Sequence, residues 1–276
     1  MLVATMLIYS TMHFLPERPL GIQKINSVIP GLLFIEPIWI QYITGIKIEL
    51  FENSFWSLFV EFKFYFIFGT FYFLFGKTKA VTGIFILFIY SILANMSGIK
   101  FLTSFSNLLS CHYFGWFTAG ALAYLYFVDH KMKYLVLSIL VSLLQLYKYH
   151  RSTGEFIGAI IVIGIFIVPV YFERIRFILN NKLFIFFGLV SYPLYLIHEN
   201  AMIAMILKLN NYTGNIPHIL LPVIPLLILL IIAYIIVKIF EPFLTRQIQL
   251  VKNQYCLQQF NKIRLFFTAG DLRVDH

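Results

Sequence analysis

The chain of 276 residues is 60% hydrophobic and only 12% charged, and its mean hydropathy is +0.85. A soluble domain carries about 25% charged residues, so this composition excludes an ordinary globular protein and favours a polytopic membrane protein. The net charge of +9 comes from basic residues spread between hydrophobic segments, which argues against nucleic acid as a partner. Cys111 and Cys256 fit neither a disulfide framework nor a metal-binding pair.

Hydrophobic segments predict an all-α transmembrane helical bundle with a partial N-terminal helix and seven full spans. The partial helix covers residues 2–14, which no cleavage motif follows, so we expect it to be retained. The full spans are predicted at 55–76, 80–97, 109–128, 133–150, 155–172, 183–207 and 217–240. Pro242 is expected to end the last helix. These limits predict a membrane domain at 1–246 and a polar cytoplasmic tail at 247–276.

Residues 15–54 lie between the partial helix and the first full span. They are rich in Ile, Leu, Phe, Trp and Pro, and Pro30 and Pro37 should break any continuous helix between residues 29 and 43. We expect this segment to lie in the membrane interface or to pack back on the bundle.

Lysine and arginine counts predict the orientation in the membrane. If the N-terminal helix leads out of the cytoplasm, the inside segments carry thirteen of these residues and the outside segments carry seven. Cytoplasmic loops have an excess of Lys and Arg, so the count favours a cytoplasmic C-terminus and an extracytoplasmic 15–54 segment. Five of the thirteen lie in residues 246–276 at the C-terminus.

The apolar stretch FWSLFVEFKFYF, residues 55–66, contains two charged residues, Glu61 and Lys63. A charge at the bilayer centre costs about 2.5–3.5 kcal/mol on insertion scales, so such a residue is usually functional. In a helix, Ser57, Glu61 and Tyr65 share one face, whereas Lys63 lies about 200° round from Glu61. Glu61 is therefore a candidate general base or acid. The alternative is a structural carboxylate that is hydrogen-bonded to Ser57 or to another helix.

A second polar group occurs in GLVSYPLYLIHEN, residues 188–200, where Pro193 should kink the helix. One polar stripe comprises Ser191, Tyr195, His198 and Glu199. A stripe on a kinked helix can form a cavity wall, in which His198 could transfer protons near neutral pH. The alternative is a structural histidine near a helix end, with Glu199 facing the lipid headgroups.

His112, Tyr113 and Trp116 open the 109–128 segment. Aromatic residues are enriched where helices enter the membrane interface. We interpret these three residues as part of an interfacial belt.

Four segments in this order resemble the signatures of the membrane-bound acyltransferase 3 family, bacterial O-acetyltransferases that modify cell-surface carbohydrates. The segments are FWSLFVEFKFYF, HYFGWFTAGALAY, GLVSYPLYLIHEN and KIFEPFLTR, and the likeness extends over about residues 1–246. It depends mainly on Trp56, Ser57, Leu58, Val60, Glu61 and Tyr65, and on Gly188, Ser191, Tyr192, Leu194, Tyr195 and His198.

The resemblance implies a multi-pass enzyme of the bacterial cytoplasmic membrane. It would transfer an acyl group, usually acetyl, from an acyl-CoA to a hydroxyl of a surface carbohydrate or peptidoglycan. Acyl-CoA is then a donor substrate, and no tightly bound cofactor or metal is implied. We expect Glu61 and His198 to be catalytic, and the substrates to be bound by Trp56, Ser57, Tyr65, Ser191 and Tyr195.

One departure from the family concerns the N-terminal part. Relatives begin with two helices that carry an arginine and the histidine thought to be the catalytic base, and nothing here matches them. We therefore expect an N-terminally truncated chain with little activity alone, for which a separately encoded N-terminal portion is a candidate partner. Two other readings stay open: an inactive acyltransferase remnant, or a transporter or lipid flippase. A transporter predicts inverted repeats and paired broken helices, which the sequence does not reveal.

Overall fold

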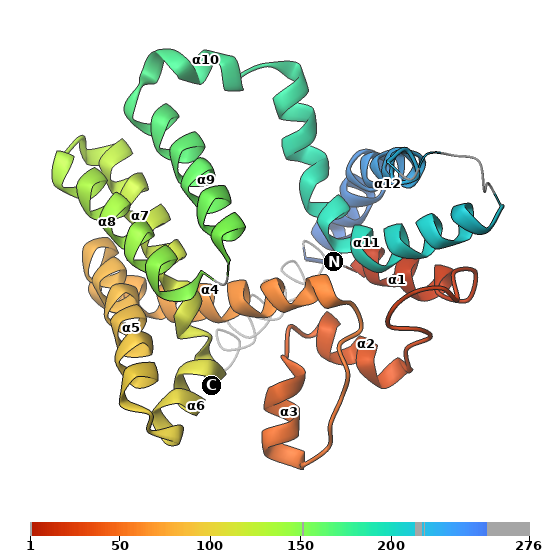
Figure 1. Ribbon diagram of the computed structural model, residues 1–276, viewed down its shortest axis with the longest axis horizontal. Helices are drawn as coiled ribbons and strands as arrows, with labels where there is room; N and C mark the ends of the chain where they lie inside the picture. Colours follow the sequence, from red (N-terminus) through yellow and green to blue (C-terminus); the bar gives the residue numbers. More distant parts are fainter. Residues whose placement is uncertain (1, 151, 213–216, 218, 253–276) are drawn as a thin grey trace, which may run out of the picture. The chain divides into compact units, whose positions relative to one another are not determined.

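The computed structural model describes residues 2–150, 152–212, 217 and 219–252, and all regular elements in this part are helical (Figure 1). The all-α prediction is therefore confirmed. The longest elements are α4 (Trp56–Phe75), α5 (Lys77–Ser97), α7 (Phe114–Asp129), α8 (Met132–Tyr149), α9 (Thr153–Tyr171), α11 (Lys182–Tyr212) and α12 (Val223–Ile235). Shorter helices are α1 (Leu2–Thr11), α2 (Ile25–Leu32), α3 (Pro37–Thr44), α6 (Lys100–Leu109) and α10 (Arg176–Leu179), with 3-10 turns η1 (Asn53–Phe55), η2 (Cys111–Tyr113) and η3 (Glu173–Ile175).

Several helices could cross a membrane, but fewer than the seven predicted. Four are long and apolar enough within the described residues: Asn53–Phe75, Lys77–Ser97, Thr153–Tyr171 and Val223–Lys252. The count rises to six if each of two bent helix pairs forms one span. The predicted span 109–128 is shortened because Ser110 has a left-handed backbone (φ 57°), so α7 begins at Phe114 and has 16 residues.

By its contacts, the chain divides into two compact units. Unit 2 comprises Leu20–Phe186, and unit 1 combines Met1–Pro19 with Phe187–His276. The motif at residues 55–66 lies in unit 2, whereas the motif at 188–200 lies in unit 1. Each unit is described by itself below.

Aromatic packing between α4, α5 and α7 forms the core of unit 2, and α7 and α8 run side by side (Figure 1). Phe64 of α4 stacks on Phe117 of α7, with ring centroids 4.0 Å apart. Phe88 of α5 is fully buried against the start of α7. Gly115 makes this close approach possible, since a Cβ there would lie 2.9 Å from the Phe88 ring.

The segment before α4 is not a simple loop. Helices α2 and α3 are bent by 110° relative to each other, a geometry typical of a broken span or a re-entrant loop. Phe34 between them has a positive φ of 55°, and Pro37 starts α3. The prediction that prolines interrupt this segment is correct, but sequence reasoning did not identify the two helices. The Trp39 indole N–H donates to the Leu108 carbonyl over 3.1 Å, so α3 packs against the end of α6 within unit 2.

In unit 1, α11 contains Pro193 and changes direction along its length (Figure 1). Proline removes one backbone hydrogen bond and clashes with the preceding turn, which is a common cause of such bends. Near the far end of α11, the Lys208 ammonium donates to the Phe14 carbonyl over 3.1 Å. This bond ties α11 to the segment that follows α1.

The final helix does not end at Pro242 as predicted. A π-helical turn, η4 (Ile236–Phe240), follows α12, and α-helix continues through residue 252. A π turn widens the helix just where Pro242 would clash with the carbonyl four residues before it, at Lys238. Residues 247–252, the first six of the predicted polar tail, are helical. Residues 253–276 lie outside the described part.

Candidate functional site

The predicted site residues fall into two groups. Trp56, Ser57, Glu61 and Tyr65 lie on α4 in unit 2, and Ser191, Tyr195 and His198 lie on α11 in unit 1. Both motifs are helical, so residues three or four positions apart within a motif lie on the same face of its helix.

On α4, Glu61 is partly exposed, and its carboxylate has no hydrogen-bond or ion-pair partner among the described residues. The Ser57 hydroxyl donates instead to the Ser54 carbonyl over 3.4 Å. The predicted alternative, a glutamate held by Ser57, is therefore not what the structure shows. Tyr65 is 63% exposed, and Trp56 packs on Tyr113 with ring centroids 5.2 Å apart. Glu61 is thus left available to a ligand.

On α11, the polar stripe bonds locally to its own helix. The Ser191 hydroxyl donates to the Gly188 carbonyl over 2.8 Å, and Nδ1 of His198 lies 2.9 Å from the Tyr195 carbonyl. A carbonyl oxygen can only accept, so in this contact Nδ1 of His198 carries the proton. In a neutral ring, Nε2 is then the basic nitrogen. This tautomer leaves the side chain ready to accept a proton at Nε2.

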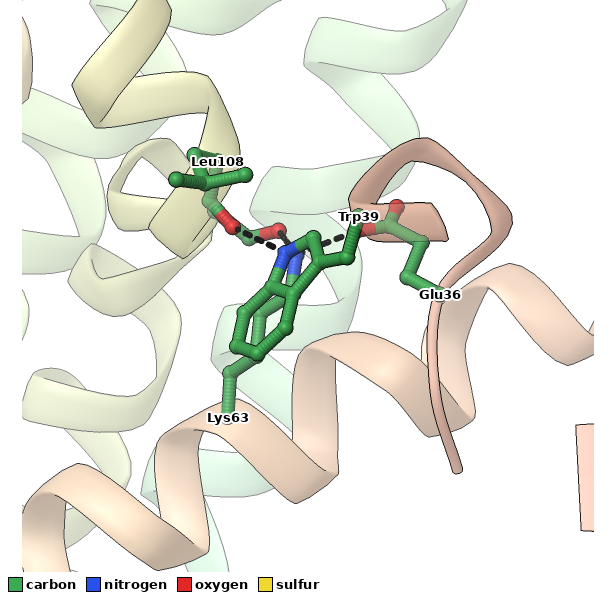
Figure 2. A network of polar contacts seen from close by, with 5 residues as sticks. Glu36, Trp39, Lys63 and Leu108 are labelled. Carbon is green, nitrogen blue, oxygen red and sulfur yellow. Dashed lines mark hydrogen bonds and ion pairs between the residues drawn. The ribbon is translucent and has the colours of Figure 1, made fainter. Parts of the chain in front are cut away.

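The basic residue that unit 2 buries most deeply is Lys63, which is only 4% exposed. Its ammonium group forms an ion pair with Glu36 and donates to the Ser110 hydroxyl over 2.8 Å. It also lies 5.7 Å from the centre of the Trp39 indole. Figure 2 shows the Lys63 side chain rising from α4 toward Trp39 and Glu36, beside the Leu108 carbonyl that Trp39 binds. Three separate elements therefore converge on one buried cation.

Sequence reasoning singled out Lys63 but assigned it no role. Its partners are distant in sequence: Glu36 lies 27 residues before it and Ser110 lies 47 residues after it. A usable signal was present, since a lysine inside a membrane segment nearly always pairs with an acid. Glu36 is the acidic residue in the apolar run between residues 29 and 43. The structure thus assigns a carboxylate partner to Lys63 and none to Glu61.

Further polar contacts join α5, η2 and α8. The Gln145 amide donates to the His112 carbonyl over 2.9 Å, and the hydroxyls of Ser91 and Tyr149 lie 2.9 Å apart. A neighbouring cavity of about 320 Å³ is bordered by Trp116, Gln145, Leu146, Tyr149, His150, Glu155, Gly158 and Ala159. These groups occupy the end of α5, the start of α7 and the end of α8. Because successive helices run in opposite directions, they share one end of unit 2 with the start of α4.

Within the described residues, no three His, Cys, Asp or Glu side chains gather as a metal site. The polar groups of unit 2 offer hydrogen bonds and charge to a substrate. Lys63 carries a full positive charge, but its ammonium is already bound by Glu36 and Ser110.

No family model, no curated protein and no solved structure matches the chain. The likeness to the acyltransferase 3 family thus rests on the four sequence segments alone and stays a prediction.

Proposed function

We propose that the protein is an integral membrane O-acyltransferase that transfers an acyl group from an acyl-CoA to a hydroxyl of a cell-surface carbohydrate or peptidoglycan. One observation carries the proposal: the four signature-like segments occur in the family's order along the chain. Two observations support it: Glu61 has no partner among the described residues, and the hydrogen bond of His198 to the Tyr195 carbonyl uses only Nδ1.

In the proposed reaction, Nε2 of His198 accepts the proton of the sugar hydroxyl while its oxygen attacks the thioester carbonyl carbon. The carbon–sulfur bond then breaks, the acyl group remains on the sugar oxygen, and the leaving thiolate takes the proton from His198. Within unit 2, we assign Glu61 to hydrogen bonding of a substrate, with Trp56, Ser57 and Tyr65 beside it on α4. Ser191 and Tyr195 would contact substrate beside His198.

Lys63 has a different role in this proposal. The Lys63 ammonium is already engaged by the Glu36 carboxylate and the Ser110 hydroxyl. We therefore assign Lys63 to holding α3 and the turn after α6 against α4. Its effect on Glu61, two residues earlier on the same helix, would be indirect.

The proposal is tested with Glu61→Gln and His198→Ala, in cells where the protein supports surface acylation. Each substitution should lower acylation, measured by mass spectrometry of surface glycans, while membrane insertion stays normal. Loss of a proton-transfer group should cost about 10²–10⁴-fold in rate at position 198. His13→Ala, at an exposed position on α1's C-terminal side, is the matched control. Acylation at the wild-type level in both variants would show that these residues are structural.

A transporter or flippase is the second candidate, because the structure contains a bent helix pair that the sequence did not reveal. The bent pair α2 and α3 lies beside a buried ion pair, and broken helices with intramembrane charges are typical of transport sites. The two candidates differ in a simple measurement. Movement of a fluorescent lipid-linked sugar across proteoliposome membranes, without any acyl donor, would favour transport over acyl transfer.

A further inference from the structure

A long apolar groove runs along unit 2 between α4, α5 and α7. Its volume is about 580 Å³, and its walls are mainly aromatic and aliphatic side chains, among them Phe64, Phe68, Tyr72, Phe117, Tyr124 and Leu125. Trp116 borders one end, and Lys77 and Val128 border the other. The predicted function does not use this groove.

The Lys77 end of the groove is strongly basic. Lys77 pairs with Asp129 over 3.3 Å, but its side chain is still 52% exposed. Lys79 follows on α5, and Lys131 and Lys133 lie at the start of α8, all three exposed. Only Lys77 lines the groove, but the two turns that hold Lys77, Lys79, Lys131 and Lys133 contain one acid, Asp129, so they carry an excess of positive charge near this end. Clusters of lysines beside a membrane-spanning helix attract anionic lipid headgroups.

The size of the groove selects among apolar occupants. Trp116 and Val128 are twelve residues apart on α7, which is about 18 Å of helix. One leaflet of the hydrocarbon core is about 15 Å thick, half of the 30 Å bilayer core. A transmembrane helix about 10 Å wide would need roughly 1,400 Å³ over that length, far more than the groove provides. An extended acyl chain fits where a helix does not.

We propose that this groove binds one acyl chain of an anionic phospholipid, with the headgroup phosphate at Lys77. The chain packs along the aromatic rings of α4 and α7, and the phosphate interacts with the lysines at the open end. This groove does not include the proposed acyl-transfer residues, so the lipid proposal does not depend on the proposed function. Under the predicted orientation, the lipid belongs to the cytoplasmic leaflet, where anionic headgroups attract basic segments.

Gly120 allows a clean test, because it lines the groove and a Cβ there would meet no atom within 4 Å. Gly120→Leu should fill the groove without disturbing the backbone. Since Gly120 also borders a smaller cavity beside α9, Ala121→Leu provides a second variant that lines only this groove. Gly69→Leu on α4 is the matched control, because its Cβ also has open space and Gly69 does not line the groove.

The measurement is native mass spectrometry of the detergent-solubilised full chain, titrated with palmitoyl-oleoyl phosphatidylglycerol or the matching phosphatidylcholine. We expect a one-to-one phosphatidylglycerol adduct at about tenfold lower lipid concentration than for phosphatidylcholine. Lys77→Gln should reduce this preference severalfold, and the two groove-filling variants should remove the adduct. Circular dichroism and gel filtration establish that each variant is folded.

Three results would overturn the proposal. Equal binding of the two lipids by the wild-type chain would remove the anionic headgroup from the assignment. An unchanged adduct in both groove-filling variants would mean that the lipid binds elsewhere on the surface. Displacement of phosphatidylglycerol by equimolar palmitoyl-CoA would assign the groove to an acyl donor instead.

Discussion

At the scale of single residues, Lys63 shows how a charge is kept inside an apolar helix. Burying an ammonium group is unfavourable unless a counter-charge and hydrogen bonds replace the water it loses. Glu36 supplies the charge and the Ser110 hydroxyl supplies a hydrogen bond. Because Glu36 precedes α3 and Ser110 follows α6, the same contacts also hold two short elements in place on unit 2.

We predict that Lys63→Met destabilises the protein by about 2 kcal/mol. Breaking a buried ion pair typically costs about 3–5 kcal/mol, and the value is lowered here because Glu36 is 25% exposed and can be rehydrated. The melting temperature in detergent measures the loss. The double variant Lys63→Met with Glu36→Gln should recover most of it, since no unpaired charge then remains.

The exposed pair between Lys77 and Asp129 is the control for this prediction. Such pairs contribute about 0–1 kcal/mol, so Lys77→Met should leave the melting temperature nearly unchanged. A loss at Lys63 no larger than the loss at Lys77 would mean that the buried pair does not stabilise unit 2.

These residues also mark how far sequence reasoning reached into the site. The intramembrane position of Glu61 and Lys63 followed from their apolar neighbours alone. Their partners did not, because the contact between Lys63 and Glu36 depends on the 110° bend between α2 and α3. No local pattern specifies that bend beyond the presence of two prolines.

At the scale of elements, two glycines on α7 occupy opposite environments. A Cβ at Gly115 would lie 2.1 Å from Oε1 of Gln145 on α8 and 2.9 Å from the Phe88 ring on α5, whereas a Cβ at Gly120 would meet nothing within 4 Å. Gly115 is therefore required by the packing of α5 and α8 on α7. Gly120 only lowers the helix propensity of α7.

We predict that Gly115→Ala and Gly120→Ala change stability in opposite directions. Overpacking against Gln145 and Phe88 should destabilise Gly115→Ala by about 1–3 kcal/mol. At Gly120, alanine should stabilise by about 0.5–1 kcal/mol, because glycine is the more flexible residue in the unfolded chain. Thermal unfolding in one detergent compares the two directly. Equal shifts of the same sign would show that α5 and α7 do not pack as described.

Continuous apolar runs made the long helices predictable. The limits of α4, α5, α8 and α9 lie within three residues of the predicted spans. The errors occur where backbone conformation depends on more than composition. Ser110 adopts a left-handed conformation that a serine does not signal, and the π turn before Pro242 lets a helix pass a residue that normally ends it.

At the scale of the whole molecule, the membrane orientation depends on which helices cross. The span Asn53–Phe75 separates the segment before α4 from the turn before α5. Helix α7 is short for a membrane crossing, because its 16 residues extend about 24 Å and the hydrocarbon core is about 30 Å thick. Local thinning of the bilayer or snorkelling of the flanking lysines can compensate for such a mismatch.

We predict that the segment before α4 is extracytoplasmic and that the turns before α5 and α8 are cytoplasmic. The physical reason is the excess of basic residues assigned to the inside, to which Lys77, Lys79, Lys131 and Lys133 contribute. The test uses single cysteines at exposed positions in a background without Cys111 and Cys256: Glu49→Cys, Thr78→Cys and Met132→Cys. None of these substitutions changes a basic residue, so the orientation signal is preserved.

With a membrane-impermeant thiol reagent, Glu49→Cys should be labelled in intact cells, and Thr78→Cys and Met132→Cys only after permeabilisation. Reversed labelling at positions 49 and 78 would invert the whole orientation and move the lysine end of the lipid groove to the outer leaflet. Labelling of both Met132→Cys and Glu49→Cys in intact cells, with Thr78→Cys still protected, would instead show that only one of α5 and α7 crosses, because positions 78 and 132 would then lie on opposite sides of the membrane.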